Sequence, residues 1–356
     1  MAAAGLLPAE ANRILVRALI KARPGPGIEL TTKPEPRPGP DEVVLKVANA
    51  GICGTDLHIF HWDRWSQEHL RLPRVLGHEF CGEVVELGER VTSLAIGDFV
   101  AAESHVPCFH CPECRGGEMH LCQNLQIIGI DRDGAFADYV AIPAFNAWKL
   151  DDSIDRSIAS VLEPLGNAVH ATLMHPVAGQ RLAVIGCGPI GLFSIAVAKQ
   201  AGAAAVYASD PNPTRRRLAA QVGADAVLDP AADDIPQSLR DLTDGAGVDV
   251  VLEMSGNQKG VTAALRAVRN GGYVTFFGLP SAAVTIELAE EVILKGLHAR
   301  GVFGRELFTT WKQMTGLLRA GLDITPLITH RLDLGDYEQA FQLLEAGEAA
   351  KIILTP

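Results

Sequence analysis

Short apolar runs of strand length dominate the first part of the chain. Residues 14–20 (ILVRALI) and 42–48 (EVVLKVA) are mostly apolar, and the turn-rich stretch PGPGIELTTKPEPRPGP separates them. Apolar runs bounded by Gly and Pro predict β-strands. Further strands are expected at 82–87 and 98–102, and β-like sequence returns over 127–149. No helical period is evident in this part of the chain, so the pattern predicts a β-rich first domain.

Strands and helices alternate in the second half of the chain. A helical period covers 154–173. Apolar strands separated by helical sequence are expected at 181–185, near 226, from 248 and from 271. Such alternation predicts a doubly wound parallel sheet with helices on both faces. The chain is expected to leave this sheet within 297–304 and to pack back on the first domain, with a helix over 307–320.

The first of these strands ends in a glycine-rich turn. The sequence GCGPIG places Gly186, Gly188 and Gly191 between the strand and an apolar helix that opens with Pro189 and Ile190. The first glycine permits a tight turn, the second lets a pyrophosphate approach the backbone, and the third allows close helix–strand packing. The helix N-terminus then binds the phosphates. This context predicts a dinucleotide-binding site.

The end of the second strand indicates which dinucleotide is bound. Asp210 lies 24 residues beyond Gly186. A carboxylate there accepts hydrogen bonds from the adenosine ribose and repels a 2′-phosphate, so NAD is favoured over NADP. Arg215 and the two arginines after it keep NADP open as an alternative, because a guanidinium accepts phosphate. Ser255 and Leu279 follow later strands of the sheet and are expected near the cofactor.

Four cysteines crowd into the segment PCFHCPECRGGEMHLC. Cys108, Cys111, Cys114 and Cys122 are separated by two, two and seven residues. Four thiolates this close cannot all form unstrained disulfides, but they can surround one tetrahedral Zn²⁺. In a comparable iron–sulfur run the last gap is three residues and a proline follows. Here Gln123 follows a gap of seven, so a structural zinc is favoured over an iron–sulfur cluster and over unligated thiols.

A second set of metal-ligating residue types lies in residues 51–82. Cys53, His78 and Glu79 supply a thiolate, an imidazole and a carboxylate, which suit an open zinc site with a free position. The alternative is that Cys53 is a small core residue and His78 a satisfied polar group at a turn. Zinc beside an NAD fold implies alcohol oxidation, because the metal favours an alkoxide that delivers hydride to nicotinamide. Thr55 and His58 form a hydroxyl–imidazole pair suited to proton relay.

Composition narrows the class of protein. The 356 residues suit two domains, and no apolar run of 18 residues predicts a membrane span. A net charge of -11 opposes binding to nucleic acid or anionic membranes. The first twenty residues contain an acid and two arginines, which argues against a signal peptide. The odd count of seven cysteines indicates metal in a reducing compartment, so a cytoplasmic enzyme is expected.

The order of these motifs resembles the zinc-dependent medium-chain dehydrogenase/reductase family over essentially the whole chain. The resemblance rests on GICGTDLHIFHWDRWSQ, GHEF, CFHCPECRGGEMHLC, LEPLGNAVHAT, LEMSG and GVFGRELFTTW. It implies a mixed α/β fold with a β-rich GroES-like catalytic domain at 1–154 and 299–356, which carries a structural-zinc lobe at about 105–125. A Rossmann NAD domain would occupy 155–298. Roughly fifteen residues precede the family's usual start and are expected to form a disordered extension.

Within this family the chain is most similar to members that oxidise the β-hydroxyl of L-threonine with NAD⁺. The product would be 2-amino-3-oxobutyrate, and the enzyme would be a homotetramer with one catalytic and one structural zinc. A polyol or butanediol dehydrogenase on the same scaffold is the alternative enzyme. A non-catalytic binding protein that keeps the fold is an alternative of a different class.

The resemblance also assigns roles by position. It makes Cys53, His78 and Glu79 the catalytic-zinc residues and adds Glu163 as a group that ligates zinc or exchanges with substrate. Without it, Glu163 is better explained as a first-turn carboxylate that complements the helix dipole.

The remaining assignments concern proton relay, substrate and cofactor. Thr55 and His58 match the relay, and His105 matches a histidine near the substrate, with a surface histidine as the alternative. Asp210 and Arg215 match residues that hold the ribose, and the four clustered cysteines match the structural-zinc ligands. Polar residues of the loop at 58–69 and Arg305 are candidates for binding the ammonium and carboxylate of the substrate.

Overall fold

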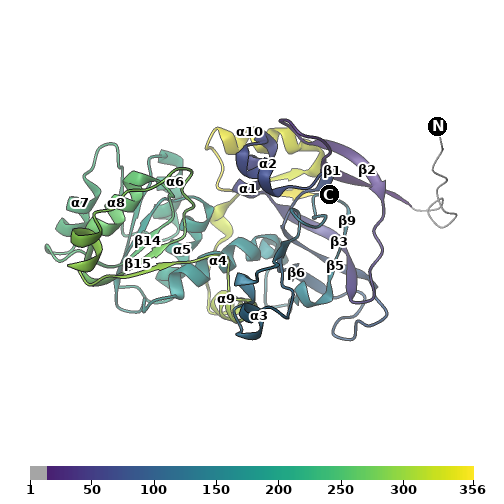
Figure 1. The fold of residues 1–356 in the computed structure, drawn as a ribbon, viewed down its shortest axis with the longest axis horizontal. Coiled ribbons are helices and arrows are strands. Elements are labelled where there is room, and N and C mark those ends of the chain that lie inside the picture. The colour runs from purple at the N-terminus through teal and green to yellow at the C-terminus, as the bar shows by residue number, and fades with distance from the viewer. Residues whose placement is uncertain (1–13) are drawn as a thin grey trace.

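Two lobes lie side by side along the long axis of the computed structural model, which describes residues 14–356 (Figure 1). Both ends of the described chain form one lobe, and the middle of the chain forms the other. The disordered extension predicted ahead of the first strand lies outside the described residues. Among residues 14–356, no helix is long and apolar enough to cross a membrane.

The first lobe is β-rich, as predicted. A small sheet has the order β2-β1-β4, and a larger one has the order β10-β6-β5-β3-β18-β17 with β9 also paired to β3. The small sheet contains β1 (Leu15–Lys21), β2 (Glu29–Pro34) and β4 (Arg74–Val75). The larger contains β3 (Glu42–Gly51), β5 (Glu79–Leu87), β6 (Phe99–Ala102), β9 (Tyr139–Pro143), β10 (Ala147–Lys149), β17 (Ile328–Asp333) and β18 (Lys351–Thr355). Because β18 pairs antiparallel with β3, the end of the chain returns to the first lobe.

The prediction that this lobe has no early helix was wrong. Helices α1 (Gly54–His61) and α2 (Arg64–His69) occupy the segment expected to be a loop. Both are too short to show a helical period, and local capping defines them instead. The Asp56 carboxylate accepts the backbone N–H of Cys53 at 2.9 Å, and Asp63 accepts that of Ser66 at 3.0 Å.

The second lobe is the predicted doubly wound sheet. Its six strands run parallel in the order β13-β12-β11-β14-β15-β16, the order of a dinucleotide-binding Rossmann fold. They are β11 (Arg181–Ile185), β12 (Ala205–Ser209), β13 (Ala226–Leu228), β14 (Val248–Glu253), β15 (Val268–Phe276) and β16 (His298–Gly301). The helices between them are α5 (Pro189–Gln200), α6 (Pro213–Gln221), α7 (Ile235–Asp241) and α8 (Gln258–Ala267). Strand β16 extends the sheet to Gly301, beyond the boundary predicted at 298.

Helix α4 (Leu162–Leu173) joins the two lobes. It packs against α5 and against α9 (Thr309–Arg319), and most of its residues are buried (Figure 1). One hydrophobic core contains residues of both lobes, among them Phe99, Leu165, Val184 and Trp311. The N-terminal turn of α4 therefore places Glu163 where the β-rich lobe meets the Rossmann lobe. Helix α10 (Tyr337–Glu345) packs beside the β-rich lobe, and its Phe341 stacks on Phe60 of α1.

Candidate active site

The structure brings Cys53, His78 and Glu79 together. One ligand atom of each lies within 4.8 Å of the other two. Cys53 is the N-cap residue of α1. His78 directly precedes β5, and Glu79 is the first residue of that strand. Strand β3 pairs with β5 there, with Gly51 opposite Glu79. Gly51 is required there, because a Cβ would collide with the Glu79 carboxylate. A thiolate, an imidazole and a carboxylate that converge in this way fit a zinc ion with a free position.

The electrostatics of this cluster suit a cation. Burial opposes protonation of His78, but the negative charges of Cys53 and Asp56 outweigh it and raise its pKa to about 10. Its Nδ1 atom is buried and has no hydrogen-bond partner among residues 14–356. Anionic surroundings that favour an imidazolium also favour a divalent ion in its place. The groups around His78 therefore favour a positive charge at its position.

Lys351 is a charged neighbour of this cluster that the sequence analysis missed. Its ammonium lies 2.6 Å from Oε1 of Glu79 and donates to the carbonyl of Ile52 at 3.0 Å. Lys351 is 1% exposed. A single lysine at the start of the apolar strand KIILT was the available signal, because a buried lysine needs a partner.

Thr55 and His58 lie on one face of α1, three residues apart. The Thr55 hydroxyl is 3.8 Å from Sγ of Cys53, so it borders the cluster. His58 is 60% exposed, and its Nδ1 lies 2.6 Å from Oδ2 of Asp63. Among the described residues no hydrogen bond joins Thr55 to His58. The two residues thus lead from the cluster outward to solvent.

Glu163 is not one of the three clustered ligand residues, but its charge acts on His78, and a polar network holds it. Its Oε1 accepts hydrogen bonds from Ser104 Oγ at 2.6 Å and from Arg305 Nη1 at 2.8 Å. Burial raises the pKa of this carboxyl, but the charges of Arg305 and His78 outweigh burial and lower it to about 2. The prediction that Arg305 binds the substrate carboxylate was wrong, because Arg305 is 0% exposed and bonds to protein carboxylates.

His105 is buried between the lobes, so the alternative of a surface histidine is excluded. Its ring stacks on Phe303 with centroids 5.6 Å apart. Burial, together with the charge of Arg305, lowers the pKa of His105 to about 3. Its ring is therefore neutral at ordinary pH and suited to accept or donate a hydrogen bond without adding charge.

The four clustered cysteines converge as a second candidate metal site. Ligand atoms of Cys108, Cys111, Cys114 and Cys122 all lie within 4.8 Å of one another, and none is in a disulfide. Cys111 Sγ and Cys122 Sγ are 3.8 Å apart, close to the edge of a zinc tetrahedron with bonds of about 2.3 Å. Backbone N–H groups of His110 and Cys111 lower the pKa of Cys108 to about 6, which favours its thiolate. These sulfurs fit a closed tetrahedral site.

The glycine-rich turn has the geometry that phosphate binding requires. Gly186 has φ +97°, and a Cβ there would lie 2.7 Å from the backbone nitrogen of Ser255. A Cβ on Gly191 would overlap the carbonyl of Gly186, whereas one on Gly188 would meet no atom within 4 Å. The turn is therefore closely packed at Gly186 and Gly191 and open at Gly188. Helix α5 begins directly after Gly188, with Pro189 and Ile190.

Asp210 is buried at the end of β12 beside this turn. It accepts the backbone N–H of Cys187 at 2.7 Å and that of Asn212 at 2.8 Å. Arg215 Nη1 lies 3.9 Å from Oδ2 of Asp210. Ser255 donates its backbone N–H to Glu253 at 2.9 Å, and Leu279 is 86% exposed. All the predicted cofactor residues lie at the carboxyl edge of the parallel sheet, where such folds bind nucleotides.

Two family models match the chain. The model of the alcohol dehydrogenase GroES-like domain covers residues 39–152, and the model of zinc-binding dehydrogenase covers residues 189–320. The L-threonine 3-dehydrogenase of Symbiobacterium thermophilum is 46% identical over 343 residues, which are 96% of this chain and 98% of that protein. The chain belongs to the zinc-dependent medium-chain dehydrogenase/reductase family.

Solved structures share the fold of this dehydrogenase. A Sinorhizobium meliloti 1021 protein bound to NADP matches with a TM-score of 0.90 and 32% identity, covering 97% of this chain and 100% of its own. The 2R,3R-butanediol dehydrogenase of Bacillus subtilis matches with a TM-score of 0.87 and 28% identity, covering 96% and 99%. The predicted fold class, GroES-like plus Rossmann, is confirmed.

The polar side chains of α1 and α2 in this dehydrogenase largely pair with protein groups. The pairs are His58–Asp63 at 2.6 Å, His61–Glu345 at 2.8 Å and Arg64–Glu68 at 2.7 Å. These contacts weaken the prediction that the segment offers free anchors for a substrate's ammonium and carboxylate.

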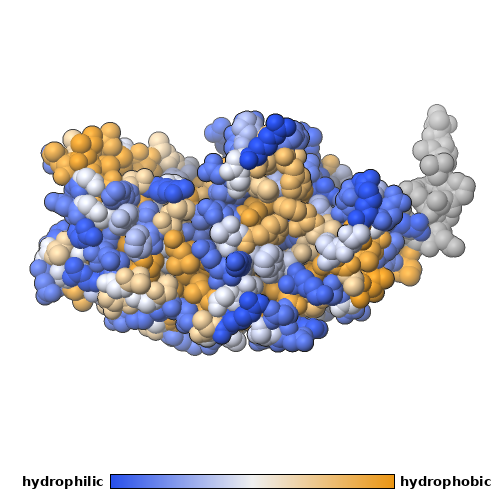
Figure 2. Space-filling view, turned by 90° about the horizontal axis from the view of Figure 1, so that it is seen from below, coloured by the Kyte–Doolittle hydropathy of each residue, from blue (hydrophilic) through white to orange (hydrophobic). Residues whose placement is uncertain are grey.

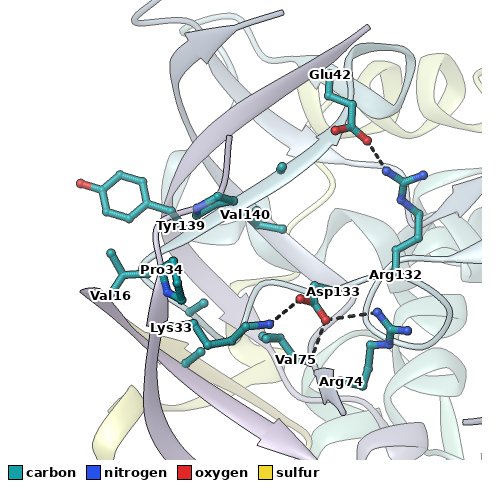
Figure 3. A pocket seen from close by; sticks show the side chains of 15 residues that line it. Val16, Lys33, Pro34, Glu42, Arg74, Val75, Arg132, Asp133, Tyr139 and Val140 are labelled. Carbon is teal, nitrogen blue, oxygen red and sulfur yellow. Dashed lines mark hydrogen bonds and ion pairs between the residues drawn. The ribbon is translucent and has the colours of Figure 1, made fainter. Parts of the chain in front are cut away.

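A hollow of about 360 Å³ lies on the β-rich lobe of the dehydrogenase (Figure 3), and none of the predicted site residues lines it. Its three basic and two acidic side chains pair with one another. Asp133 pairs with Lys33 at 2.6 Å and with Arg74 at 3.1 Å, and Arg132 pairs with Glu42. Because every charged side chain that lines this hollow already lies in an ion pair, we assign the hollow no role.

Proposed function

We propose that this dehydrogenase oxidises the β-hydroxyl of L-threonine with NAD⁺ and forms 2-amino-3-oxobutyrate. The observation that carries the proposal is 46% identity over 96% of the chain to a protein named L-threonine 3-dehydrogenase. A further relative with that name, from Pyrococcus horikoshii, is 45% identical over 94% of the chain. The match covers nearly the whole chain, so it includes the segments that carry Cys53, His78 and Glu79.

Zinc held by Cys53, His78 and Glu79 would act as a Lewis acid that acidifies the substrate hydroxyl. In the proposed reaction the hydroxyl proton passes to Thr55 and then to His58, from which it reaches solvent. NAD⁺ held at the Gly186 turn would supply the two-electron oxidant, which would accept the hydride of the β-carbon. His105 is neutral and stacks on Phe303, and it would orient the substrate by hydrogen bonding.

We infer that NAD is the cofactor rather than NADP. Asp210 supports this inference because its buried carboxylate would face a 2′-phosphate with a negative charge. Arg215 is the residue that argues for NADP, yet its guanidinium already lies within ion-pair distance of Asp210. The adenosine ribose would therefore meet the Asp210 carboxylate, whose charge is partly offset by Arg215.

The alternative is a polyol or butanediol dehydrogenase, which the match to the Bacillus subtilis butanediol enzyme favours. NADH formation by the zinc-loaded protein with L-threonine, sorbitol and 2,3-butanediol separates the two. We expect the highest kcat/KM with L-threonine. A higher value with either diol would exclude the threonine assignment while leaving the chemistry of the metal site intact.

We also propose a homotetramer in which subunits meet through the Rossmann lobe. Strand β16 is an edge strand whose four residues are all exposed, and such an edge can pair with a second chain. Apolar side chains gather at the end of the molecule that this lobe forms (Figure 2). Exposed apolar residues of the lobe include Leu279, Leu288, Ile293 and Leu294. Light scattering should show tetramers for the wild type and smaller species for Leu294→Glu. Leu242→Glu, at an exposed leucine at the end of α7, is the control and should remain a tetramer.

A cytoplasmic location is proposed from the cysteines. All seven are free thiols, and several lie close enough together to oxidise in a secretory compartment. Fractionation of the native host would test this location, and recovery of the protein outside the cytoplasm would contradict it.

A further inference from the structure

Arg305 is a fully buried charge in the segment between β16 and α9. Its guanidinium reaches four side chains, two from the β-rich lobe and two from helix α4. Nε donates to Glu103 Oε2 at 2.7 Å, and Nη2 donates to Glu103 and, at 3.0 Å, to Ser104 Oγ. Nη1 donates to Glu163 Oε1 at 2.8 Å and to Asn167 Oδ1 at 3.0 Å. Every nitrogen of the guanidinium is therefore bonded.

Glu103 fixes the direction of this guanidinium. It is 0% exposed, accepts Arg305 through both carboxylate oxygens, and also accepts Trp311 Nε1 at 2.7 Å. The backbone N–H of His105 adds a bond at 2.8 Å. A bidentate arginine–carboxylate pair has a defined plane, so the remaining nitrogen, Nη1, must point toward α4.

Helix α4 is shaped to receive Arg305. Gly166 lies between Glu163 and Asn167, and a Cβ on Gly166 would come within 2.6 Å of Arg305 Cδ. Glu163 and Asn167 are four residues apart and so lie on the same face of the helix. One face of α4 therefore supplies the carboxylate, the amide and the space that the guanidinium needs.

The tether engages only one oxygen of Glu163. Ser104 Oγ and Arg305 Nη1 both end on Oε1. Within residues 14–356, no protein donor forms a hydrogen bond with Oε2. We propose that Arg305 is a positioning residue, which tethers Oε1 of Glu163 and leaves Oε2 available to the metal centre and its bound alcohol. The inference rests on the proposed function only in requiring that Glu163 serves that centre.

Lysine cannot replace this arrangement. Its ammonium is a point charge on a flexible stem and lacks the planar fork that joins Glu103 to Glu163. Arg305→Lys therefore keeps the charge and loses the geometry. We expect kcat to fall by about 10- to 100-fold, as is typical when a partner of a metal-site residue is lost. Arg319→Lys, in an exposed pair with Asp151, is the matched control and should retain wild-type kcat.

The decisive measurement is a double-mutant cycle of Arg305→Lys and Glu163→Gln. If Arg305 acts through Glu163, the double variant should have the same kcat as Glu163→Gln alone. Effects that multiply, or wild-type kcat in Arg305→Lys, would overturn the proposal. The cycle uses whichever alcohol the wild type oxidises best, so failure of the threonine assignment would not be mistaken for failure of this one.

A second readout does not depend on turnover. The visible absorption of the Co²⁺-loaded protein reports the surroundings of the catalytic metal, and we expect alcohol binding to change this spectrum less in Arg305→Lys than in the wild type. An identical alcohol response in both proteins would contradict the tether. If Arg305→Lys fails to fold, Ser104→Ala is the second variant, because it removes the other hydrogen bond to Oε1 of Glu163. Ser104→Ala alone should lower kcat. Added to Glu163→Gln, it should cause no further loss.

Discussion

The ammonium of Lys351 lies 2.6 Å from Oε1 of Glu79, although the two residues are 272 positions apart. Both residues are buried. Strand β18 thus brings a permanent positive charge to a candidate zinc ligand. A buried carboxylate is costly without a partner, and Lys351 is the partner that the fold gives Glu79.

Lys351→Met should destabilise the metal-free protein by about 3–5 kcal/mol, because it leaves the Glu79 charge buried and unpaired. Added zinc should recover part of this loss, since the ion supplies the missing positive charge. Urea unfolding with and without zinc measures both effects. Lys149→Met, in an exposed pair with Asp98, is the control and should cost about 1 kcal/mol or less. Equal stability of the two variants would contradict the assignment.

Cys53→Ser should abolish turnover and leave NAD binding intact. The substitution removes the thiolate of the open metal site, whereas the Gly186 turn lies in the other lobe. Steady-state NADH formation and calorimetric titration with NAD⁺ test the two halves of this expectation. Retained turnover would remove the proposed metal chemistry.

Cys111→Ser should act on folding rather than on chemistry. Loss of one thiolate opens the closed four-cysteine site, and we expect a destabilisation of about 4 kcal/mol or more, as is usual when a structural metal is lost. Metal analysis of the purified protein should fall from two zinc ions per chain to one. Protein that survives should still bind substrate, and a variant as stable as the wild type would argue against a structural zinc.

Asp210→Gly should relax the preference for NAD. Removing the carboxylate leaves Arg215 free to meet a 2′-phosphate, so the ratio of kcat/KM with NADP to that with NAD should rise by about tenfold or more. Because Asp210 also accepts the Cys187 N–H, the affinity for NAD should fall as well. Asp241→Asn, on the exposed end of α7, is the control. An unchanged ratio would show that Asp210 does not read the ribose.

His175, which follows α4, is one of the residues that make the stability depend on pH, and buried His105 is another. Burial lowers the pKa of His175 to about 4, whereas the ordinary value in an unfolded chain is about 6.5. Between these values the unfolded chain binds a proton that the folded chain does not, so the free energy of unfolding falls as the pH falls from about 6.5 to 4. His175→Gln should flatten this decline in thermal unfolding measured at pH 7 and 4.5. The same substitution at exposed His69 should leave the decline unchanged, and a decline equally steep in His175→Gln would exclude His175 as its source.

The amino-acid sequence by itself determined the parts that depend on neighbouring residues. A strand, three glycines and an apolar helix follow one another directly, so the dinucleotide turn at Gly186 was predictable from local order. The spacing from Cys108 to Cys122 likewise confines four sulfurs to one small volume, whatever the rest of the chain does. Helices α1 and α2 were missed because six to eight residues cannot display a helical period against a polar background.

Only the tertiary structure decided which distant charges meet. Lys351 reaches Glu79 because β18 pairs with β3, and Arg305 reaches Glu163 because the segment after β16 crosses between the lobes. Neither pairing leaves a local pattern, since 272 positions separate the first pair and 142 separate the second. Burial then sets their chemistry, because a lysine or arginine removed from water must find a carboxylate, and the fold determines which one is within reach.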